Sequence, residues 1–236
     1  MSISYRLLKA SAFPDIKVDY SVPSQLSYLA DKEVPATHIQ RQHIPLQEGL
    51  ESFYITHQLI VHQFGRAQNV EFVEYAAEFH LWAYYRQADG LLLIQGNKDS
   101  VADLCYTLNS RASEDFSLQN YEVDFQKLEP HLEVISGSWF RYKAVSLHAM
   151  GIFGNHVDTT AEYQTAKTLG TQTAINFYHT FLGADIPLQI TRNAIVVIQA
   201  NIESLPLEVE IVLDVKKTLL DKALNTVEKR RKKMPQ

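Results

Sequence analysis

The sequence has very little cysteine and glycine, and each shortage excludes classes of site. Cys105 is the only cysteine among 236 residues, so neither an intramolecular disulfide nor a multi-thiolate metal site can form. The nine glycines never fall in a G-x-G-x-x-G pattern, and no G-K-[ST] phosphate loop occurs. The standard ATP- and dinucleotide-binding loops are therefore excluded, and we expect no cofactor.

Long apolar runs are also missing. No stretch reaches the roughly 18 apolar residues that a membrane-spanning helix needs. Arg6, Lys9 and Pro14 interrupt the first segment before it reaches the length of a signal peptide. With 46% hydrophobic and 21% charged residues, the composition is that of an ordinary folded protein. We expect no membrane span and a cytoplasmic location.

The charge is distributed unevenly along the chain. Residues 216–236 carry eight Lys or Arg and two Asp or Glu, whereas residues 1–215 carry 14 and 25, which gives +6 and −11. A block of like charge is stabilised by a nearby counter-charge, because its own charges repel one another. We therefore expect a body over 1–215 and a basic tail over 216–236. Nucleic acid, anionic lipid, an acidic protein and the body itself are the candidate partners of the tail.

Apolar periodicity predicts the elements of the first half. Residues 49–64 place apolar side chains at helical spacing and predict a helix that ends near Gly65. Two β-type runs around the turn-forming Ala88, Asp89 and Gly90 predict a hairpin. Residues 98–111 then predict a helix with Asp99 or Ser100 as its N-cap; its apolar face consists of Val101, Leu104, Cys105 and Leu108. On that face the Cys105 thiol would be buried, and burial disfavours the thiolate of a nucleophile.

The second half alternates strands and helices. The expected strands are 118–125, one long strand over 138–154, and a meander of 172–182, 186–191 and 194–200. The expected helices are 125–137, 159–170 with a Thr cap and a Gly stop, and a long basic C-terminal helix over 205–232. These elements predict an α+β fold with mostly antiparallel sheet, hairpin-helix units and that long basic C-terminal helix. A seam near 112–118 or 137 would divide the body, and one domain or two remain alternatives.

One group of three residues could bind a metal ion. His148, His156 and Asp158 flank a glycine-rich corner, and two imidazoles with a carboxylate are suitable ligands for a divalent metal. The competing interpretation is that the glycines permit a bulge while Asp158 makes turn or cap bonds. A metal-dependent hydrolase or nuclease centred on these three residues is the alternative function.

The basic tail carries the leading hypothesis. Its candidate phosphate-binding cations are Lys222, Lys229, Arg230, Arg231, Lys232 and Lys233. Cations near a helix C-terminus also complement the helix dipole, so the cluster alone is a weak signal. We expect a non-enzymatic cytosolic interaction protein, a subunit of a larger assembly, that binds a protein partner and contacts nucleic acid through these cations.

Overall fold

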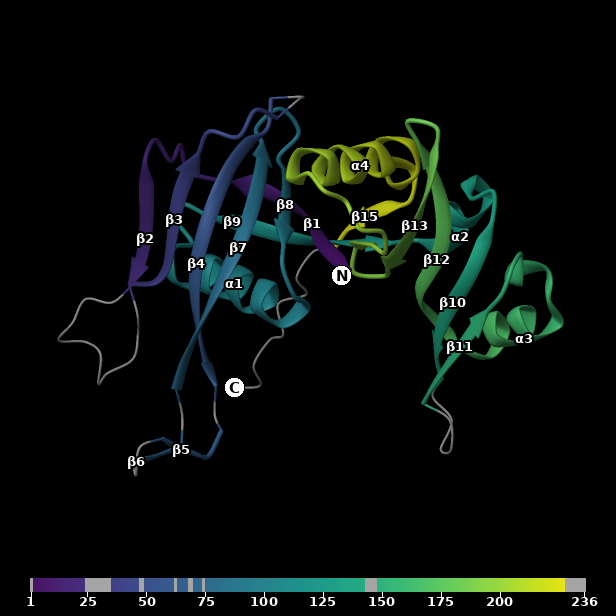
Figure 1. Ribbon diagram of the computed structural model, residues 1–236, viewed down its shortest axis with the longest axis horizontal. Helices are drawn as coiled ribbons and strands as arrows, with labels where there is room; N and C mark the ends of the chain where they lie inside the picture. The colour runs from purple at the N-terminus through teal and green to yellow at the C-terminus, as the bar shows by residue number, and fades with distance from the viewer. Residues whose placement is uncertain are drawn as a thin grey trace, which may run out of the picture. The chain divides into compact units, whose positions relative to one another are not determined.

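The structure is a computed structural model that describes residues 2–23, 35–46, 49–61, 63–67, 70–73, 75–142 and 148–227. Strands dominate these ranges, which contain fifteen strands and four α-helices. The chain divides into two compact units: unit 1 comprises residues 1–9 and 119–236, and unit 2 comprises residues 10–118. Strands β1 (Ile3–Ala12) and β9 (Ser117–Val123) contain residues of both units (Figure 1).

Unit 2 is an antiparallel sheet with helix α1 (Lys98–Arg111). Its strands follow the order β8-β7-β4-β3-β2, and each neighbouring pair is antiparallel. Their bounds are β2 Asp19–Pro23, β3 Pro35–Gln42, β4 Glu51–Val61, β7 Tyr75–Arg86 and β8 Leu91–Gln95. A small separate hairpin pairs β5 (Gly65–Ala67) with β6 (Val70–Phe72). The predicted hairpin followed by a helix is confirmed in β7, β8 and α1.

Helix α1 packs on one face of this sheet. Its predicted apolar face is buried, although the N-cap is Asn97, whose side chain accepts from the backbone N–H groups of Asp99 and Ser100. Phe53, Ile55 and His57 of β4 are buried as well, and the His57 Nε2 lies 3.0 Å from Asp103 Oδ2 on α1. Alternate residues of β4 therefore face the helix, as strand geometry requires.

The helix predicted over 49–64 is wrong, because most of that segment is strand β4. Its apolar residues satisfy a period of two as well as a period of 3.6, and the buried Phe53, Ile55 and His57 follow the shorter period. The segment is also rich in β-branched and aromatic residues, which favour a pleated surface. Pairing with β3 and β7 on both sides fixed the strand.

Unit 1 contains antiparallel strands in the order β11-β10-β12-β13-β14, with the start of β1 beside β14. Its strands are β10 Ile135–Arg141, β11 Ala149–Phe153, β12 Thr171–Phe181, β13 Ala184–Thr191, β14 Ile195–Ile198 and β15 Leu224–Thr226, which pairs with β9. Its α-helices are α2 Phe125–Leu128, α3 Ala161–Leu169 and α4 Leu205–Thr218. Short 3-10 helices cover Glu129–His131, Val157–Thr159 and Leu220–Lys222. The predicted meander is confirmed in β12, β13 and β14.

Two expectations for unit 1 need correction. The helix predicted over 125–137 is limited to α2 and one 3-10 turn, after which β10 begins at Ile135. The long strand predicted over 138–154 is a hairpin of β10 and β11, in which the Tyr142 N–H donates to the carbonyl of His148. Strands usually have up to about ten residues, and β7 has 12. A longer alternating segment more often folds back on itself as two paired strands.

The predicted α+β class with a long basic C-terminal helix is contradicted. The fold is dominated by antiparallel sheet, and α4 ends at Thr218 instead of continuing toward 232. Leu219, Leu220 and Ala223 are buried, and a turn of 3-10 helix followed by β15 places them in the core. Residues 228–236 lie outside the described ranges. Within those ranges, no helix is long and apolar enough to cross a membrane.

Candidate functional site

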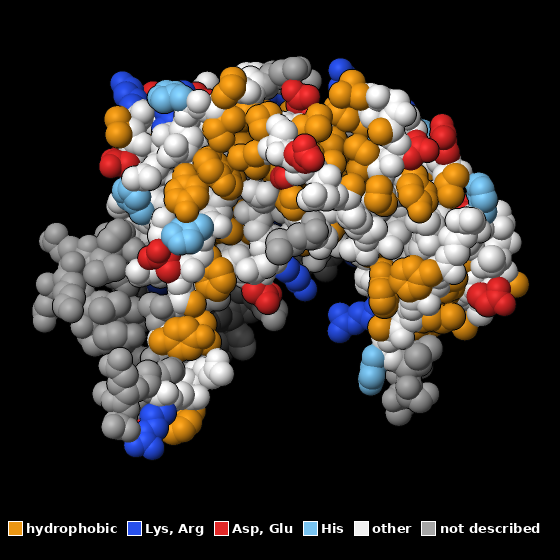
Figure 2. All heavy atoms as spheres, in the orientation of Figure 1, with side chains coloured by type: hydrophobic (Ala, Val, Ile, Leu, Met, Phe, Trp, Pro, Cys, Tyr) orange, Lys and Arg blue, Asp and Glu red, His pale blue; other side chains and the backbone are white. Residues whose placement is uncertain are grey.

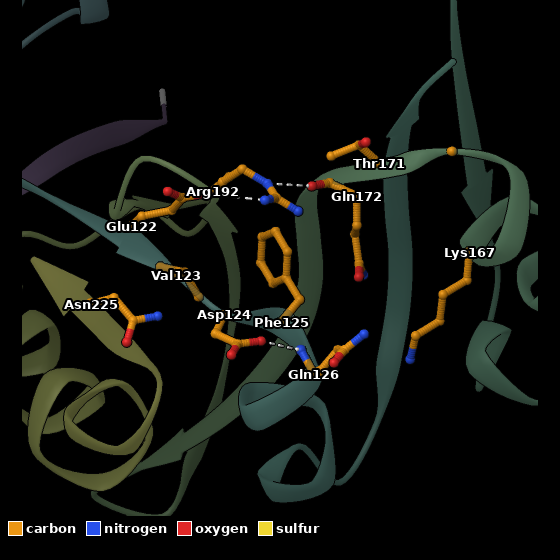
Figure 3. Close-up of a pocket in the computed structure, with 11 residues that line it drawn as sticks. Glu122, Val123, Asp124, Phe125, Gln126, Lys167, Thr171, Gln172, Arg192 and Asn225 are labelled. Atoms are coloured by element: carbon orange, nitrogen blue, oxygen red, sulfur yellow. Dashed lines mark hydrogen bonds and ion pairs between the residues drawn. The ribbon is translucent and has the colours of Figure 1, made fainter. Parts of the chain in front are cut away.

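A polar pocket of about 520 Å³ opens in unit 1 (Figure 3). Five separate segments supply its walls: the end of β9 with the start of α2, the last turns of α3, the start of β12, the turn after β13, and β15. Its charged side chains are Glu122, Asp124, Lys167 and Arg192. Small-molecule sites usually measure about 300–1,000 Å³, so the pocket has the size of a ligand site.

Arg192 is held in a fixed position over this pocket. Its Nε donates to the backbone carbonyl of Gln172 at 2.9 Å, and its Nη1 donates to Glu122 Oε1 at 3.0 Å. The guanidinium carbon also lies 6.0 Å from the ring centroid of Phe125. The backbone is anchored too, because the Arg192 N–H bonds Thr173 and its carbonyl accepts from Val123. The remaining nitrogen, Nη2, makes no hydrogen bond with the described residues.

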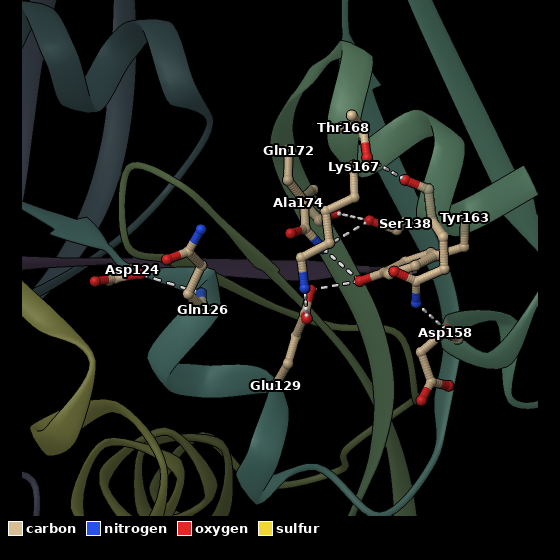
Figure 4. A network of polar contacts seen from close by, with 11 residues as sticks. Asp124, Gln126, Glu129, Ser138, Asp158, Tyr163, Lys167, Thr168, Gln172 and Ala174 are labelled. Atoms are coloured by element: carbon tan, nitrogen blue, oxygen red, sulfur yellow. Dashed lines mark hydrogen bonds and ion pairs between the residues drawn. The ribbon is translucent and has the colours of Figure 1, made fainter.

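Lys167 belongs to a network of buried polar groups (Figure 4). Helix α3 places Tyr163 and Lys167 four residues apart on one face, so both donate to the carboxylate of Glu129. The Gln172 side-chain amide then donates to the Tyr163 hydroxyl at 3.0 Å and to Ser138 Oγ at 2.9 Å. Tyr163 and Ser138 are fully buried. The network therefore fixes the lysine and the glutamine that line the pocket.

The environment of Tyr163 makes it a hydrogen-bond donor rather than a base. Burial raises the pKa of Tyr163 well above its usual range, and the hydrogen bond and charge of Glu129 raise it further. The hydroxyl consequently stays protonated at physiological pH. It donates to Glu129, which also neutralises Lys167.

Asp124 supplies a carboxylate on another wall of the pocket. It is the N-cap of α2, where its Oδ1 accepts from the backbone N–H of Gln126 at 3.1 Å. Its Oδ2 lies 3.8 Å from Nζ of Lys127, which is longer than a hydrogen bond. The pocket thus presents two cations and two carboxylates, and it can bind a small polar molecule through charged and hydrogen-bonding groups.

The three proposed metal ligands are not gathered in one cluster. His148 is exposed and precedes β11, whereas His156 is exposed and follows β11 with a left-handed φ of 52°. Asp158 lies in a 3-10 turn, and its backbone carbonyl accepts from the Gln164 side chain. Among the described residues, no group of three His, Cys, Asp or Glu side chains could hold a metal ion. The corner instead uses backbone groups to form a turn before α3.

The basic residues singled out in the sequence fall mostly beyond the described part of the chain. Lys222 is exposed at the end of the 3-10 turn before β15. Lys229, Arg230, Arg231, Lys232 and Lys233 lie outside the described residues. Lys222, the described member of this set, does not line the pocket.

Sequence reasoning missed the residues of the pocket. The spacing of Tyr163 and Lys167 on a predicted helix was a usable signal, because residues four apart share a face. Glu122 and Arg192 are 70 residues apart and carry no local signal.

No protein-family model matches the chain, and a search of curated proteins finds no match.

Proposed function

We propose that this protein is a non-enzymatic binding protein and that the pocket beside Arg192 and Lys167 binds a small polar molecule. The observation that supports the proposal is the arrangement of these two cations. They come from different elements, and each is fixed by a carboxylate of its own, Glu122 and Glu129 respectively. Side chains that are fixed before binding lose little entropy when a ligand arrives. Their geometry is that of a prepared recognition site.

The state of the titratable groups favours binding over catalysis. A general base needs a pKa near the working pH and a free lone pair. Tyr163 has a pKa raised far above that range, and Glu129 accepts hydrogen bonds from both Tyr163 and Lys167. These groups hold the pocket in shape, which is why we infer a binding role.

The test is a titration of the full chain with acetate, glycine, methylamine, inorganic phosphate and glycerol, followed by the amide chemical shifts of Gln126 and Gln172. We expect at least one probe to shift both signals. The variant Arg192→Gln should weaken that binding by tenfold or more, since it removes a charged hydrogen bond. The control Lys217→Gln removes an equal charge from an exposed position of unit 1 outside the lining and should bind as the wild type does. Equal binding by wild type and Arg192→Gln would contradict the proposal.

A second proposal concerns the protein partner, and strand β11 favours it. This strand ends the sheet of unit 1. Because Tyr142 and His148 form a hydrogen-bonded pair, the alternation of an antiparallel ladder turns the backbone groups of Ala149, Gly151 and Phe153 away from β10. An unpaired edge of this kind can accept a strand from another chain. We propose that the protein works in the cytoplasm as a subunit of an assembly joined at β11.

Exposed aromatic side chains beside this edge provide the test. Phe153 is 55% exposed and its ring packs against that of Trp139. We expect Phe153→Asp to release the protein from its assembly, measured as a lower mass by native size-exclusion chromatography of cell extracts. The matched control is Tyr178→Asp, which changes a 46% exposed aromatic of β12 and should leave the mass unchanged. An identical mass for wild type and Phe153→Asp would exclude assembly through β11.

A further inference from the structure

We infer that the ligand of the pocket is a small zwitterion that carries one carboxylate and one ammonium group. The inference rests on the proposed binding function and narrows its ligand class. It depends on the balance and the separation of charge in the pocket. In the lining, Lys167 and Arg192 supply two positive charges, and Glu122 and Asp124 supply two negative charges; Glu129, which pairs with Lys167, adds a third carboxylate outside the lining.

The balance of charge disfavours the other ligand classes. A phosphate or polyphosphate would bring two or more negative charges beside Glu122 and Asp124, whose repulsion offsets the attraction of the cations. An apolar ligand would displace water from charged groups without replacing their hydrogen bonds. The four charged side chains keep between 31% and 42% of their surface exposed, so a ligand can reach all of them.

The carboxylate of the ligand would bind at the cationic wall. Nη2 of Arg192 has no partner in the described part of the chain, and the Lys167 ammonium gives only one of its three protons to Glu129. Figure 3 shows the guanidinium of Arg192 above the Phe125 ring, the side-chain amide of Gln172 to the right of the ring and the Lys167 side chain farther to the right. Charge-assisted hydrogen bonds from these two donors are stronger than neutral ones.

The ammonium of the ligand would bind at Asp124. Figure 3 places Asp124 on the other side of Phe125 from Lys167, so these two opposite charges lie on different sides of the pocket, whereas Glu122 stays paired with Arg192. Asp124 Oδ1 caps α2, but Oδ2 has only the long, exposed ion pair with Lys127. An ammonium at Oδ2 would replace this weak pair with a hydrogen-bonded one.

The experiment uses a series of amino carboxylates of increasing length, namely glycine, β-alanine and 4-aminobutyrate, with acetate, methylamine and inorganic phosphate for comparison. Binding to the full chain is followed through the amide shifts of Gln126 and Gln172. We expect at least one amino carboxylate to bind tenfold or more tightly than acetate and methylamine. In Asp124→Asn that advantage should disappear while acetate binding is unchanged. The variant keeps the helix cap, because Asn is as good an N-cap as Asp.

The outcomes separate this inference from the proposed function. If acetate binds in an Arg192-dependent way and the amino group adds nothing, the zwitterion is excluded and the binding function stands. Tighter binding of phosphate than of every amino carboxylate leads to the same conclusion. If no probe shifts the signals of Gln126 and Gln172, both the function and the ligand class are overturned. Asp124→Asn with undiminished preference for the amino carboxylate would also overturn the inference.

Discussion

At the scale of single residues, Glu208 is a carboxyl group buried where its ionised form is unfavourable. Its side chain is only 5% exposed in the core of unit 1, and the Tyr5 hydroxyl donates to its Oε2 at 2.7 Å. Burial raises the pKa of Glu208 above its usual value, and the hydrogen bond from Tyr5 opposes that shift only in part. The charged form therefore costs stability in the folded protein.

We predict that Glu208→Gln stabilises the protein at pH 8. An acid whose pKa is raised on folding binds more protons in the native state, so the free energy of unfolding falls as pH rises from the ordinary pKa of 4.5 through the raised value. The amide keeps an acceptor for Tyr5 and cannot ionise. Urea unfolding of both proteins between pH 4 and pH 8 measures the effect. The wild type should lose stability relative to Glu208→Gln across that interval, and a constant difference would contradict the assignment.

The second prediction concerns the buried hydroxyl of Tyr163. Tyr163→Phe removes the donor to Glu129 and leaves the Gln172 amide without one of its acceptors. Leaving buried polar groups unpaired costs about 1–3 kcal/mol, so we expect a loss of that size in the free energy of unfolding. Denaturant unfolding checks it, with Tyr178→Phe at a 46% exposed position as the control. Equal stability of the two variants would show that Tyr163 is not needed to hold the network.

At the scale of elements, the hairpin of β10 and β11 depends on the small size of Gly151. A Cβ atom there would lie 2.6 Å from the Phe153 ring and 3.1 Å from the Trp139 ring. We predict that Gly151→Ala displaces the Phe153 ring and, because that ring is 55% exposed and can move, lowers the free energy of unfolding by less than the roughly 1–3 kcal/mol of overpacking in a core. The emission of Trp139, isolated by Trp82→Phe, should shift in Gly151→Ala. Ala149→Ser on the same exposed strand should leave it unchanged, and an equal shift in both would refute the close contact.

The elements that sequence predicts well are those with strong local signals. Helix α3 has the predicted Thr cap, which is Thr160, and ends before Gly170, and the turn around Asp89 joins β7 to β8. Each depends on interactions within a few residues. In contrast, β4 was mistaken for a helix because its pattern fits two periods, and its neighbours β3 and β7 determine which one applies.

The residues of the pocket could not be predicted from the sequence for a similar reason. Arg192 follows β13, Glu122 ends β9 and Glu129 follows α2, so long-range packing alone brings their partners together. The corner around His156 shows the opposite error. Its residue types suited a metal, but the described backbone separates His148 from His156 by strand β11.

At the scale of the whole molecule, the uneven charge predicts how the tail behaves. We expect replacement of Lys229, Arg230, Arg231, Lys232 and Lys233 by Gln to leave the melting temperature unchanged, since a run of like charge has few ion pairs to lose and single surface pairs contribute little to stability. If the tail binds duplex nucleic acid, the affinity should fall and the log-log salt slope should decrease by about 0.9 for each lost phosphate contact. Fluorescence anisotropy over a salt series measures both. A wild-type protein without affinity for DNA or RNA at low salt excludes the nucleic-acid role.

The path of the chain through the two units has a consequence for the gene. Unit 2 occupies one uninterrupted stretch, and its ends are close, because Ser11 Oγ donates to Ser117 Oγ at 2.8 Å. The cut ends of unit 1 are close as well, since Arg6 Nη2 donates to Asn120 Oδ1 at 2.9 Å. Residues 10–118 could therefore be deleted as one segment of the coding sequence, with a few small residues joining Lys9 to Gln119. Close ends of this kind are what the insertion of one module into another requires.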